Sequence, residues 1–547
     1  MENTTLGIMQ KILPLLLAAV LGGCGADGET VVKHSRHIPR EHIKFGTPMS
    51  AVLEKEKLYD SITDPEVIKA MRECGVSVIE TRLVWSELER EKGVLDYSRL
   101  ERDMALIEKN GFKVGVFNWF QHPPKWSDLT RARCLAHGVD STIISLWDPR
   151  YLAEYDRLLK DLAQKYGSRI SFLYVGVHGD YGEVMYPAGC KHYKFSPPHG
   201  HSGLWCGDSL ARADFQNRMR AKYKTVEALN AAWKTNFNSF DDDLMPKLPL
   251  EANNINMRAD FALWYSKSLI DFTDKICAIA RRHFPDTKMA LPVGCLYESR
   301  SGEGMNKSQT AKLAAKYNMT ARWTGVAHTK EFARTNVSTK RLSAAARFYG
   351  AKFGVEAAAG IAGTKVPAAI YESLANGSSM FHNDPASILK ELPQYLACDK
   401  YLKCLPRRCD KGVYYPYLAE ITRSIDIRDF YAEFAKVRGH CDYELTDDFM
   451  IGDGFLKTVK ELILVKNCPI PQKTADILAK WQSEGGSVYH IKNYPPVILE
   501  TGAPAPLGTP VESFDFFGKS DGCFYTDHGD VVSKFNPATG GIEFIKK

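Results

Sequence analysis

Between residues 41 and 395, short apolar segments alternate with stretches in which apolar residues recur at helical spacing. Helical patterns include 64–73, where Asp64 can cap the helix and Pro65 fits its first turn, and 149–166. Strands that alternate with helices pair in parallel, so the pattern predicts an α/β fold, a (β/α)8 TIM barrel over 41–395. Its eight strand candidates are 42–49, 78–85, 113–120, 171–177, 288–295, 322–328, 352–356 and 378–383.

The connection after the fourth strand is unusually long. It contains a loop over 185–207, a helical pattern over 208–233 and a second helical pattern over 257–283. A long insertion at the carboxyl end of barrel strands commonly shapes a substrate pocket or a contact between subunits. We expect one of these two roles here.

A second βα pattern predicts a small doubly wound α/β domain over 408–495. Its elements are strands 412–417, 461–466 and 487–491 and helices 428–439 and 472–484. No GxGxxG fingerprint accompanies them, so no nucleotide is expected. Residues 496–547 are predicted to form a linker, rich in Pro and Gly over 501–510, and a short β tail that reads as a hairpin.

The N-terminus has the pattern of an export signal. Lys11 precedes an apolar run, 12–21, that is too short to span a bilayer but has the length of a signal-peptide core. The run ends in Leu21-Gly22-Gly23-Cys24, which resembles the bacterial lipobox. This resemblance implies that residues 1–23 are a lipoprotein signal peptide, that Cys24 is lipidated and that 24–40 form a tether. The alternative is a plain signal peptide followed by a chance cysteine.

We therefore expect an exported bacterial lipoprotein of the cell envelope, in the outer membrane or facing the periplasm. No later segment is apolar enough to span a membrane, so the lipid anchor is the only membrane contact expected. With 44% hydrophobic and 25% charged residues the chain has the composition of a globular protein. A net charge of +6, with both signs interspersed, lacks the footprint of a nucleic-acid binder and suits a neutral or weakly charged substrate.

Three of the 13 cysteines flank or approach a loop rich in His, Pro and Gly. Export to an oxidising compartment permits Cys190 and Cys206 to pair, and Cys134 is a further candidate. A metal cluster of these three is an alternative, but the chain has no tight CxxC pair of the zinc type. We expect a disulfide or free thiols and no metal.

Two glutamates stand where barrel strands end. Glu183 follows the fourth strand, and Glu356 ends the seventh strand after the apolar Phe353-Gly354-Val355. The carboxyl ends of barrel strands meet at one face, so both side chains are expected at the barrel mouth. Two carboxyl groups there can cleave a glycosidic bond without a cofactor, one donating a proton and the other acting as nucleophile or base. Each glutamate alone could instead be a solvent-facing charge.

Other polar and aromatic residues are predicted to surround this pair and to bind substrate. Sugars are held by aromatic faces and by polar side chains that read hydroxyl groups. Any of these residues could instead serve packing. The candidates are Arg82, Trp119, His122, Tyr181, His328, His382 and Asn383.

Several segments resemble glycoside hydrolase family 42 β-galactosidases. Residues 81–89, followed by 93–97 and by Pro123-Pro124-Lys125-Trp126, resemble the second and third barrel units of that family. Residues 220–237, which contain Ala231-Ala232-Trp233, are similar to its Leu-Asn-x-Ala-Trp-Gly-Thr-x-Phe stretch. The second domain resembles the amidotransferase-like trimerisation domain of the family, which implies a possible homo-oligomer.

The resemblance implies that Glu183 is the acid/base and Glu356 the nucleophile of a retaining enzyme. One departure concerns the residue before the acid, where the clan has Asn contacting the sugar 2-hydroxyl and this chain has Gly182. Residues 182–187 are also similar to the acid motif Gly-Glu-Leu-Arg-Tyr-Pro of β-amylases, which are inverting enzymes.

Three hypotheses follow. The first is a retaining, exo-acting β-glycosidase, specifically a β-galactosidase, acting on oligo- or polysaccharides. The second is an inverting hydrolase with a mechanism like that of β-amylases, in which Glu356 activates water. The third is a glycan-binding lipoprotein without catalysis.

Overall fold

The structure is a computed structural model. It describes residues 44–48, 64–73, 75–187, 203–294, 304–324, 332–356, 368, 371–373, 375–382, 392–393, 396 and 407–547. The predicted signal peptide, the tether and four of the predicted residues lie outside the described residues. Those four are Cys24, Cys190, His328 and Asn383.

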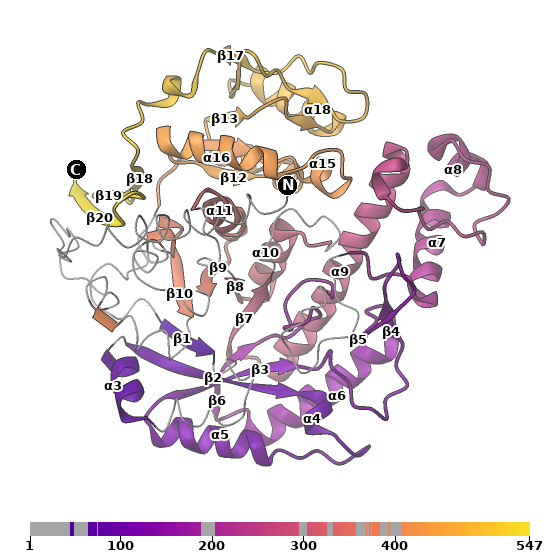
Figure 1. The fold of residues 1–547 in the computed structure, drawn as a ribbon, viewed down its shortest axis with the longest axis vertical. Coiled ribbons are helices and arrows are strands. Elements are labelled where there is room, and N and C mark those ends of the chain that lie inside the picture. The colour runs from indigo at the N-terminus through magenta and orange to yellow at the C-terminus, as the bar shows by residue number, and fades with distance from the viewer. Residues whose placement is uncertain are drawn as a thin grey trace, which may run out of the picture.

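Eight parallel strands close into a barrel in the order β1-β10-β9-β8-β7-β6-β3-β2 (Figure 1). The predicted (β/α)8 barrel is therefore confirmed. Each predicted barrel strand overlaps an observed one, and the bounds differ by a few residues. The strands are β1 (Lys44–Pro48), β2 (Val76–Val84), β3 (Lys113–Trp119), β6 (Ile170–Tyr174), β7 (Lys288–Val293), β8 (Thr320–Thr324), β9 (Lys352–Glu356) and β10 (Ser378–His382).

Helices connect the strands and cover the outside of the barrel (Figure 1). They bury their apolar stripes against the outward faces of the strands, as amphipathic helices do. Asp148 caps one of them, α6, by accepting from the Arg150 backbone N–H. The helices are α3 (Pro65–Glu73), α4 (Trp85–Leu88), α5 (Ser98–Lys109), α6 (Pro149–Tyr166), α9 (Ile255–His283), α10 (Lys307–Lys316) and α11 (Phe332–Tyr349).

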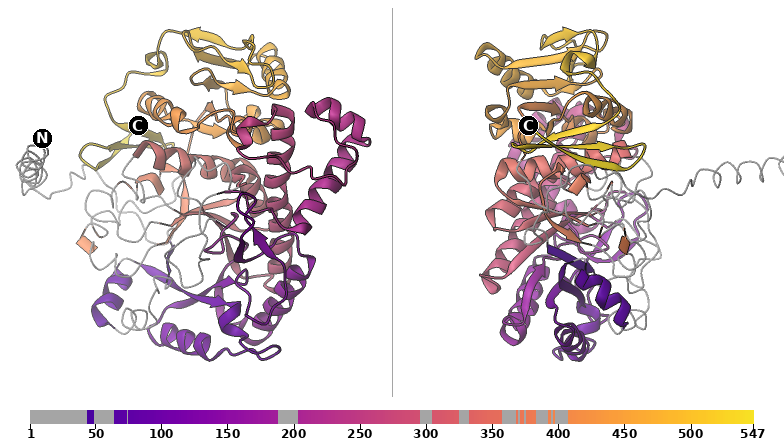
Figure 2. Two further views of the ribbon diagram at one scale, coloured as in Figure 1. Left: turned by 45° about the vertical axis from the view of Figure 1, so that its right-hand side comes forward. Right: turned by 90° about the vertical axis from the view of Figure 1, so that its left-hand side faces the viewer.

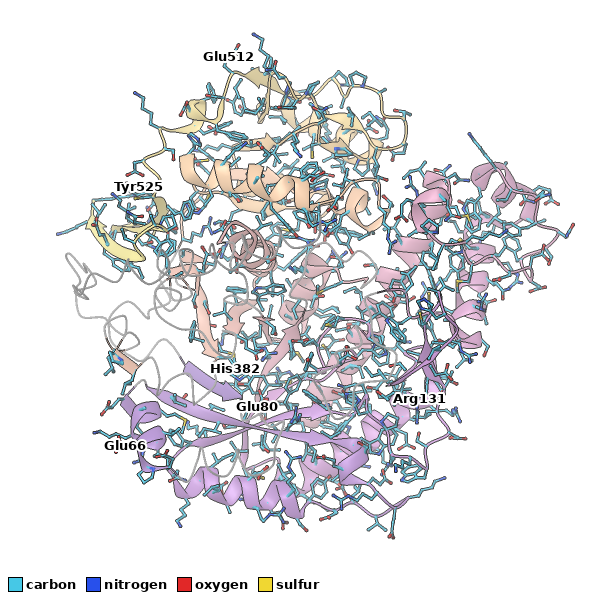
Figure 3. All side chains as sticks on the ribbon, in the orientation of Figure 1. Glu66, Glu80, Arg131, His382, Glu512 and Tyr525 are labelled. Carbon is cyan, nitrogen blue, oxygen red and sulfur yellow. The ribbon has the colours of Figure 1, made fainter. Side chains whose placement is uncertain are left out.

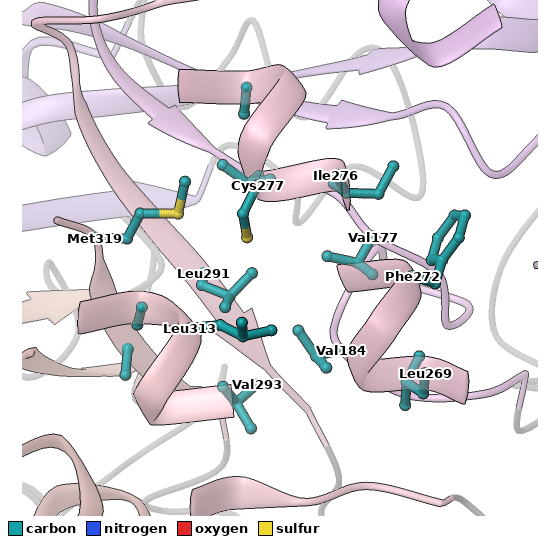
Figure 4. Close-up of a cluster of buried hydrophobic side chains, with 14 of the residues drawn as sticks. Val177, Val184, Leu269, Phe272, Ile276, Cys277, Leu291, Val293, Leu313 and Met319 are labelled. Carbon is teal, nitrogen blue, oxygen red and sulfur yellow. The ribbon is translucent and has the colours of Figure 1, made fainter. Parts of the chain in front are cut away.

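An apolar cluster fixes β7 against its covering helices (Figure 4). Leu291 and Val293 of β7 lie with Leu313 of α10 and Ile276 of α9, and all four are buried. Val177 and Val184, from the two sides of the turn after β6, join the same cluster. Burying a side chain of this size contributes about 1.5–3 kcal/mol, so this packing holds the turn to the barrel wall.

The insertion after β6 differs from the prediction in one respect. The single helix predicted over 208–233 is two helices, α7 (Ser209–Tyr223) and α8 (Val226–Trp233). Lys224 between them has a positive φ of 67°, which ends α7, and Thr225 caps α8 by accepting from the Ala228 N–H. The preceding connection, after β3, also contains a short hairpin of β4 (Arg131–Arg133) and β5 (Asp140–Ile144) that the sequence pattern did not predict.

The second domain is a parallel five-stranded sheet in the order β12-β11-β13-β15-β17, as predicted for a doubly wound fold. Two of its strands were not predicted, β12 and β17. The sheet strands are β11 (Lys411–Tyr414), β12 (Glu444–Thr446), β13 (Glu461–Leu464), β15 (Ser487–Ile491) and β17 (Thr509–Val511), and β14 (Pro469–Ile470) pairs with β16 (Val497–Ile498). The helical elements are α15 (Tyr417–Ile421), α16 (Arg428–His440), α17 (Asp448–Gly452), η4 (Phe455–Thr458), α18 (Gln472–Ser483) and η5 (Phe514–Phe517).

The segment after 495 is more ordered than the predicted linker and hairpin. Thr509–Val511 pairs in parallel with β15, so part of the predicted linker is an edge strand of the sheet. The tail is an antiparallel sheet of three strands, β18 (Phe524–Asp527), β19 (Val531–Asn536) and β20 (Gly541–Lys546). It packs on the barrel domain, where the Tyr371 hydroxyl donates to the Phe524 carbonyl at 3.0 Å.

Helix α11 joins the two domains, since it packs on β8 and β9 on one side and on α16 and β12 on the other. Figure 2 shows the second domain stacked on this side of the barrel. Buried ion pairs fill the contact: the Lys340 ammonium lies 2.9 Å from Asp442 Oδ1, and Arg407 Nη2 lies 2.7 Å from the same oxygen. A buried charge is costly without its partner, so these ion pairs favour one arrangement of the two domains.

Candidate active site

Alternate residues of the strands face the barrel interior. A separate apolar cluster, including Val78, Phe117, Tyr174 and Met380, fills its lower part. Side chains on a strand alternate between its faces, so the polar residues two and four positions after Val78 face inward too. Small residues make room for the larger ones, since a Cβ on Gly354 would lie 3.0 Å from the Met380 Cβ. The interior is therefore packed, with polar side chains gathered near the carboxyl ends of the strands.

Glu183 lies in a tight turn directly after β6. The Val177 N–H donates to the Gly182 carbonyl at 2.8 Å, and the Val184 N–H donates to the Pro292 carbonyl of β7 at 2.9 Å. Gly182 has a positive φ of 75°, a conformation that glycine adopts without strain. Val184 is anchored in the apolar cluster, whereas the Glu183 carboxylate reaches Gly294, where an added Cβ would lie 2.2 Å from Glu183 Oε2. The turn thus places the carboxyl group over the end of β7.

Burial is the main influence on the Glu183 carboxyl, whose side chain is 5% exposed. It raises the pKa, and the negative charge of Glu356 raises it further, whereas Arg322 and a hydrogen bond with Thr324 lower it. The resulting pKa of Glu183 is about 7. A carboxyl group with such a value keeps its proton in slightly acidic solution, as a general acid requires.

Glu356 ends β9 and is held by a cation. Arg322 Nη1 on the neighbouring strand β8 lies 2.5 Å from Glu356 Oε2. The guanidinium is 2% exposed and the carboxylate 19% exposed, so the carboxylate is the more accessible partner. The guanidinium is permanently charged and forms an ion pair that holds this carboxyl group in place. Glu356 is thus positioned to act as a nucleophile or base.

Thr324 connects the two glutamates. Its Oγ1 donates to Glu356 Oε2 at 3.1 Å, and its side chain is also hydrogen-bonded with Glu183. A hydroxyl group has one proton to donate and can accept from others. The two carboxyl groups therefore lie on either side of one threonine at the mouth of the barrel.

A third glutamate, Glu80 of β2, lies deeper in the barrel beside His382 of β10 (Figure 3). Glu80 Oε2 and His382 Nε2 are 3.4 Å apart, and the two side chains are 1% and 0% exposed. On its other side, His382 Nδ1 lies 2.8 Å from Arg322 Nη1. Burial, with the cation Arg322 adding to it, holds the pKa of His382 well below its usual value, so the imidazole is neutral.

The Glu80 carboxyl has a pKa raised to about 8. Burial is the main cause, and Glu356 adds to it, whereas Arg322 and Arg82 lower the pKa. At neutral pH Glu80 is therefore mostly uncharged. The charge beneath Glu183 and Glu356 is then the positive charge of Arg82 and Arg322.

An aromatic group lines the barrel mouth near Glu183. The Arg82 guanidinium stacks on Trp119, with Cζ 4.2 Å from the ring centroid, and Tyr181 meets the same ring edge-on. His122 Nε2 lies 3.0 Å from the Asp180 carbonyl oxygen, and burial lowers its pKa to about 4. Because the ring is neutral and the partner is a carbonyl oxygen, Nε2 is the donor.

The predicted site residues within the described part of the chain come together around one end of the barrel. Glu183 and Glu356 share a hydroxyl partner, and Arg82, Trp119, His122 and Tyr181 lie in contact with one another or with residues of the Glu183 turn. Three of the predicted sugar contacts are nearly inaccessible, because Trp119, His122 and His382 are 1%, 3% and 0% exposed. Their role in substrate binding stays a prediction.

Sequence reasoning missed Arg322, Thr324 and Glu80. All three are polar residues on otherwise apolar strands, at the same two-residue spacing that places Arg82 in the interior. This spacing was the available signal. Their contacts with Glu356 on β9 and His382 on β10 were not visible in the sequence.

The predicted cysteine cluster is only partly described. Cys206 is a buried free thiol, and burial holds its pKa well above the usual value. Cys134 is buried, and its Sγ lies 3.4 Å from His137 Nδ1. Within the described ranges, no group of three or more His, Cys, Asp or Glu side chains is arranged to hold a metal. None of the described helices combines the length and apolar composition needed to cross a bilayer.

Fold and site together define a (β/α)8 barrel protein with two carboxyl groups at the ends of barrel strands four and seven. The family model described as Beta-galactosidase, Glyco_hydro_42, matches residues 59–312. The resemblance to glycoside hydrolase family 42 that the sequence motifs indicated is thereby confirmed.

Relatives with curated functions match over shorter stretches. A Thermus sp. protein named beta-galactosidase BgaA is 26% identical over 236 residues, covering 40% of this chain and 34% of the relative. A protein of Thermoanaerobacterium thermosulfurigenes named thermophilic beta-amylase is 27% identical over 170 residues, covering 28% of this chain and 29% of the relative. The matched segments thus span about a third of the length of these relatives.

The fold as a whole is similar to solved structures. A beta-galactosidase from the psychrophilic Marinomonas ef1 superposes with a TM-score of 0.65 at 14% identity, covering 90% of this chain and 95% of that chain. At this identity the likeness concerns the fold alone, and it extends over both domains.

Proposed function

We propose that this protein is a glycoside hydrolase that removes β-galactosyl units from the ends of oligo- or polysaccharides. The observation that carries the proposal is the link through Thr324 between a buried Glu183, with a pKa of about 7, and Glu356, which is paired with Arg322. Cleavage of a glycosidic bond requires two carboxyl groups, one that keeps its proton and acts as the acid and one that acts as nucleophile or base. The similarity to family 42 supports the choice of β-galactosides.

In the proposed retaining reaction, Glu356 attacks the anomeric carbon while the bond from that carbon to the leaving-group oxygen breaks. Glu183 gives its proton to the departing oxygen. Glu183, now ionised, then takes a proton from water, the water oxygen bonds to the anomeric carbon, and the bond to Glu356 breaks. The sugar leaves with its original anomeric configuration, and both carboxyl groups return to their starting states.

The variant Glu356→Ala tests this assignment. It should lose turnover of aryl β-galactosides, and azide should restore release of the aryl group by forming a glycosyl azide of inverted configuration. The matched control is Glu512→Ala, which changes an exposed glutamate of the second domain and should keep full activity. Full activity in Glu356→Ala would exclude the role given to Glu356.

The second candidate is an inverting hydrolase, in which Glu356 activates a water molecule. The likeness of residues 182–187 to the β-amylase acid motif and the similarity to a thermophilic beta-amylase favour it. Inverting enzymes separate their carboxyl groups by about 6.5–9.5 Å, and retaining enzymes by about 5–5.5 Å. NMR of the first product decides, because a β-galactoside yields β-galactose with retention and α-galactose with inversion.

A third candidate, a glycan-binding protein without catalysis, is supported by the glycine at position 182 in place of the Asn of the clan. A panel of chromogenic aryl glycosides tests it. Release of product from any of them excludes this candidate, whereas calorimetric binding of sugars with no release from the panel supports it.

We also propose that the chain is anchored to the cell envelope through a lipid on Cys24 and forms homo-oligomers through its second domain. The lipobox-like Leu21-Gly22-Gly23-Cys24 supports the anchor. Labelling of the full chain with a palmitate analogue in a bacterial host should mark the wild type and not Cys24→Ala. Light scattering after size-exclusion chromatography of a Cys24→Ala protein gives the subunit number, and a single-chain mass would exclude the oligomer.

A further inference from the structure

Four side chains from four strands form a continuous polar chain inside the barrel. Glu80 on β2 meets His382 on β10, His382 meets Arg322 on β8, and Arg322 meets Glu356 on β9. The first three side chains are at most 2% exposed. The chain therefore runs from the closed interior to the accessible carboxylate at the mouth.

The partners fix the protonation of the imidazole. A guanidinium can only donate hydrogen bonds, so the Nδ1 atom of His382, 2.8 Å from Arg322 Nη1, must accept. The ring is neutral, so its single N–H is on Nε2, the atom 3.4 Å from Glu80 Oε2. The contact with Arg322 therefore selects this tautomer of His382, and the Glu80 carboxyl is the polar group that faces its N–H.

Arg322 contacts three partners at once. Its Nη1 donates to His382 Nδ1 and forms an ion pair with Glu356 Oε2 at 2.5 Å, and its Nη2 donates to Thr324 Oγ1 at 3.2 Å. Because the guanidinium is planar and rigid, the acceptor that His382 provides limits its rotation away from Glu356. His382 lies at the end of β10, in register with Glu356 at the end of β9.

We propose that Glu80 and His382 are positioning residues: together they orient the Arg322 guanidinium against Glu356 and so hold that carboxylate ready for reaction with the sugar. The inference rests on the proposed function of Glu356 and adds two residues that do not touch the substrate. It assigns His382 to the support of Arg322 instead of the predicted sugar contact.

The charge state of Glu80 affects the contact between Arg322 and Glu356. The groups facing it are Arg82 on its own strand, Arg322 on β8, Glu356 on β9, His382 on β10 and Tyr174 on β6. Burial keeps Glu80 mostly protonated at neutral pH, so Glu80 does not compete with Glu356 for the positive charge of Arg322. Ionisation of Glu80 at higher pH would add a second carboxylate beside Arg322 and weaken its hold on Glu356.

The test at position 382 compares two variants that differ in one acceptor. His382→Asn can place an amide oxygen near the position of Nδ1 and accept from Arg322, whereas His382→Phe keeps a ring of similar shape and accepts nothing. We expect His382→Phe to lower kcat about 10²-fold, the loss that a misplaced reacting group causes, and His382→Asn to retain most of it. KM should change little in both, because neither residue touches the sugar. Equal kcat losses in the two variants, or a change confined to KM, would overturn the proposal.

The companion pair at position 80 separates the acceptor from its charge. Glu80→Gln keeps an amide oxygen facing His382 Nε2 and cannot ionise. It should therefore keep most of kcat at pH 6, and it should not show the fall in kcat that ionisation of Glu80 causes in the wild type above about pH 8. Glu80→Leu should lose kcat as His382→Phe does, and the double variant with His382→Phe should lose little more, because both act through Arg322. Independent losses that multiply in the double variant would contradict a shared action.

Thermal unfolding supplies a readout that needs no substrate. Burial raises the pKa of Glu80 in the folded state, so the wild type loses stability as pH rises from about 5 through 8, and Glu80→Gln does not. The Tm of Glu80→Gln minus that of the wild type should therefore increase over this range. If the wild type cleaves no glycoside, the hydrolase proposal fails by itself. A Tm difference that does not change with pH is a separate failure, since Glu80 would then not be protonated at neutral pH in the folded protein.

Discussion

Thr324 Oγ1 lies 3.1 Å from Glu356 Oε2 and donates to it, while the same side chain is hydrogen-bonded with Glu183. Burial raises the pKa of Glu183 to about 7, so this carboxyl group can keep a proton close to neutral pH. Acid-assisted cleavage of a glycosidic bond needs such a proton donor beside the second carboxyl group.

The pH dependence of the reaction should follow Glu183. Its pKa of about 7 and the need for its protonated form predict that kcat/KM falls as pH rises through about 7. Glu183→Gln should lower kcat about 10²–10⁴-fold on substrates with poor leaving groups and remove this alkaline limb. Dinitrophenyl glycosides, whose leaving group needs no proton, should lose much less in the glycosylation step. An unchanged limb in Glu183→Gln would assign the ionisation to another group.

Removing the Thr324 hydroxyl should shift that limb. The hydrogen bond with Thr324 lowers the pKa of Glu183, so its loss in Thr324→Val should raise this pKa and move the alkaline limb to higher pH. We expect kcat to fall about fivefold as well, since one hydrogen bond contributes about 1 kcal/mol. Thr324→Ser keeps the hydroxyl and is the control, in which the limb should stay in place. pH profiles of both variants with one aryl glycoside provide the measurement.

The turn that carries Glu183 depends on glycine at position 182. Gly182 has a φ of 75°, and an added Cβ would lie 3.1 Å from both Phe117 and Trp119. Gly182→Ala should therefore combine backbone strain with crowding and lower the free energy of unfolding by about 2–3 kcal/mol. Gly93 has a φ of 83° with nothing within 4 Å of its added Cβ, so Gly93→Ala isolates the strain and should cost about 1–2 kcal/mol. Urea unfolding measures both, and equal losses would show that the crowding is relieved by small shifts.

The same turn explains why position 182 carries glycine and no larger residue. An asparagine tolerates positive φ better than alanine, but its Cβ would meet the same two aromatic rings. Phe117 and Trp119 fill the space next to Gly182 in this chain. The departure noted in the sequence is therefore coupled to the aromatic side chains of β3.

Most of the barrel was predictable because buried parallel strands give short apolar runs, and such runs alternate with helical patterns along the chain. The elements that were missed are short or lack that signal. β12 has three residues, and β17 contains Pro510, which a strand tolerates at the sheet edge. The break between α7 and α8 contains neither Gly nor Pro, so only the capping Thr225 marks it.

The site was predictable to the extent that it depends on strand ends. Glu183 and Glu356 could be placed at the barrel mouth because each follows or ends an apolar strand. The contacts of Arg322 with Glu356 and His382 join residues 34 and 60 positions apart in the sequence, and they depend on which strands are neighbours in the closed barrel. No local pattern carries that information, so the support beneath the carboxyl pair emerged only from the fold.

The contact between the two domains should depend on Asp442. Its Oδ1 lies 2.9 Å from the Lys340 ammonium, 2.7 Å from Arg407 Nη2 and 3.5 Å from Arg438 Nε. Burial alone would raise the pKa of Asp442, but Arg407, Arg438 and Lys340 outweigh it and hold the pKa well below its usual value. Asp442→Asn leaves three buried cations without their shared anion, and we expect it to lower the free energy of unfolding by about 3–5 kcal/mol.

The sign of the pH effect gives a second measurement on the same residue. Because the folded-state pKa of Asp442 is lowered, its contribution is complete above the unfolded value of about 4 and is lost as pH falls below it. The gap in Tm between wild type and Asp442→Asn should therefore narrow as pH falls from 6 toward 3. Asp128→Asn, at an 89% exposed carboxylate paired with Arg150, is the control and should change stability by less than about 1 kcal/mol. A gap that stays constant with pH would show that the loss comes from altered packing and not from the missing charge.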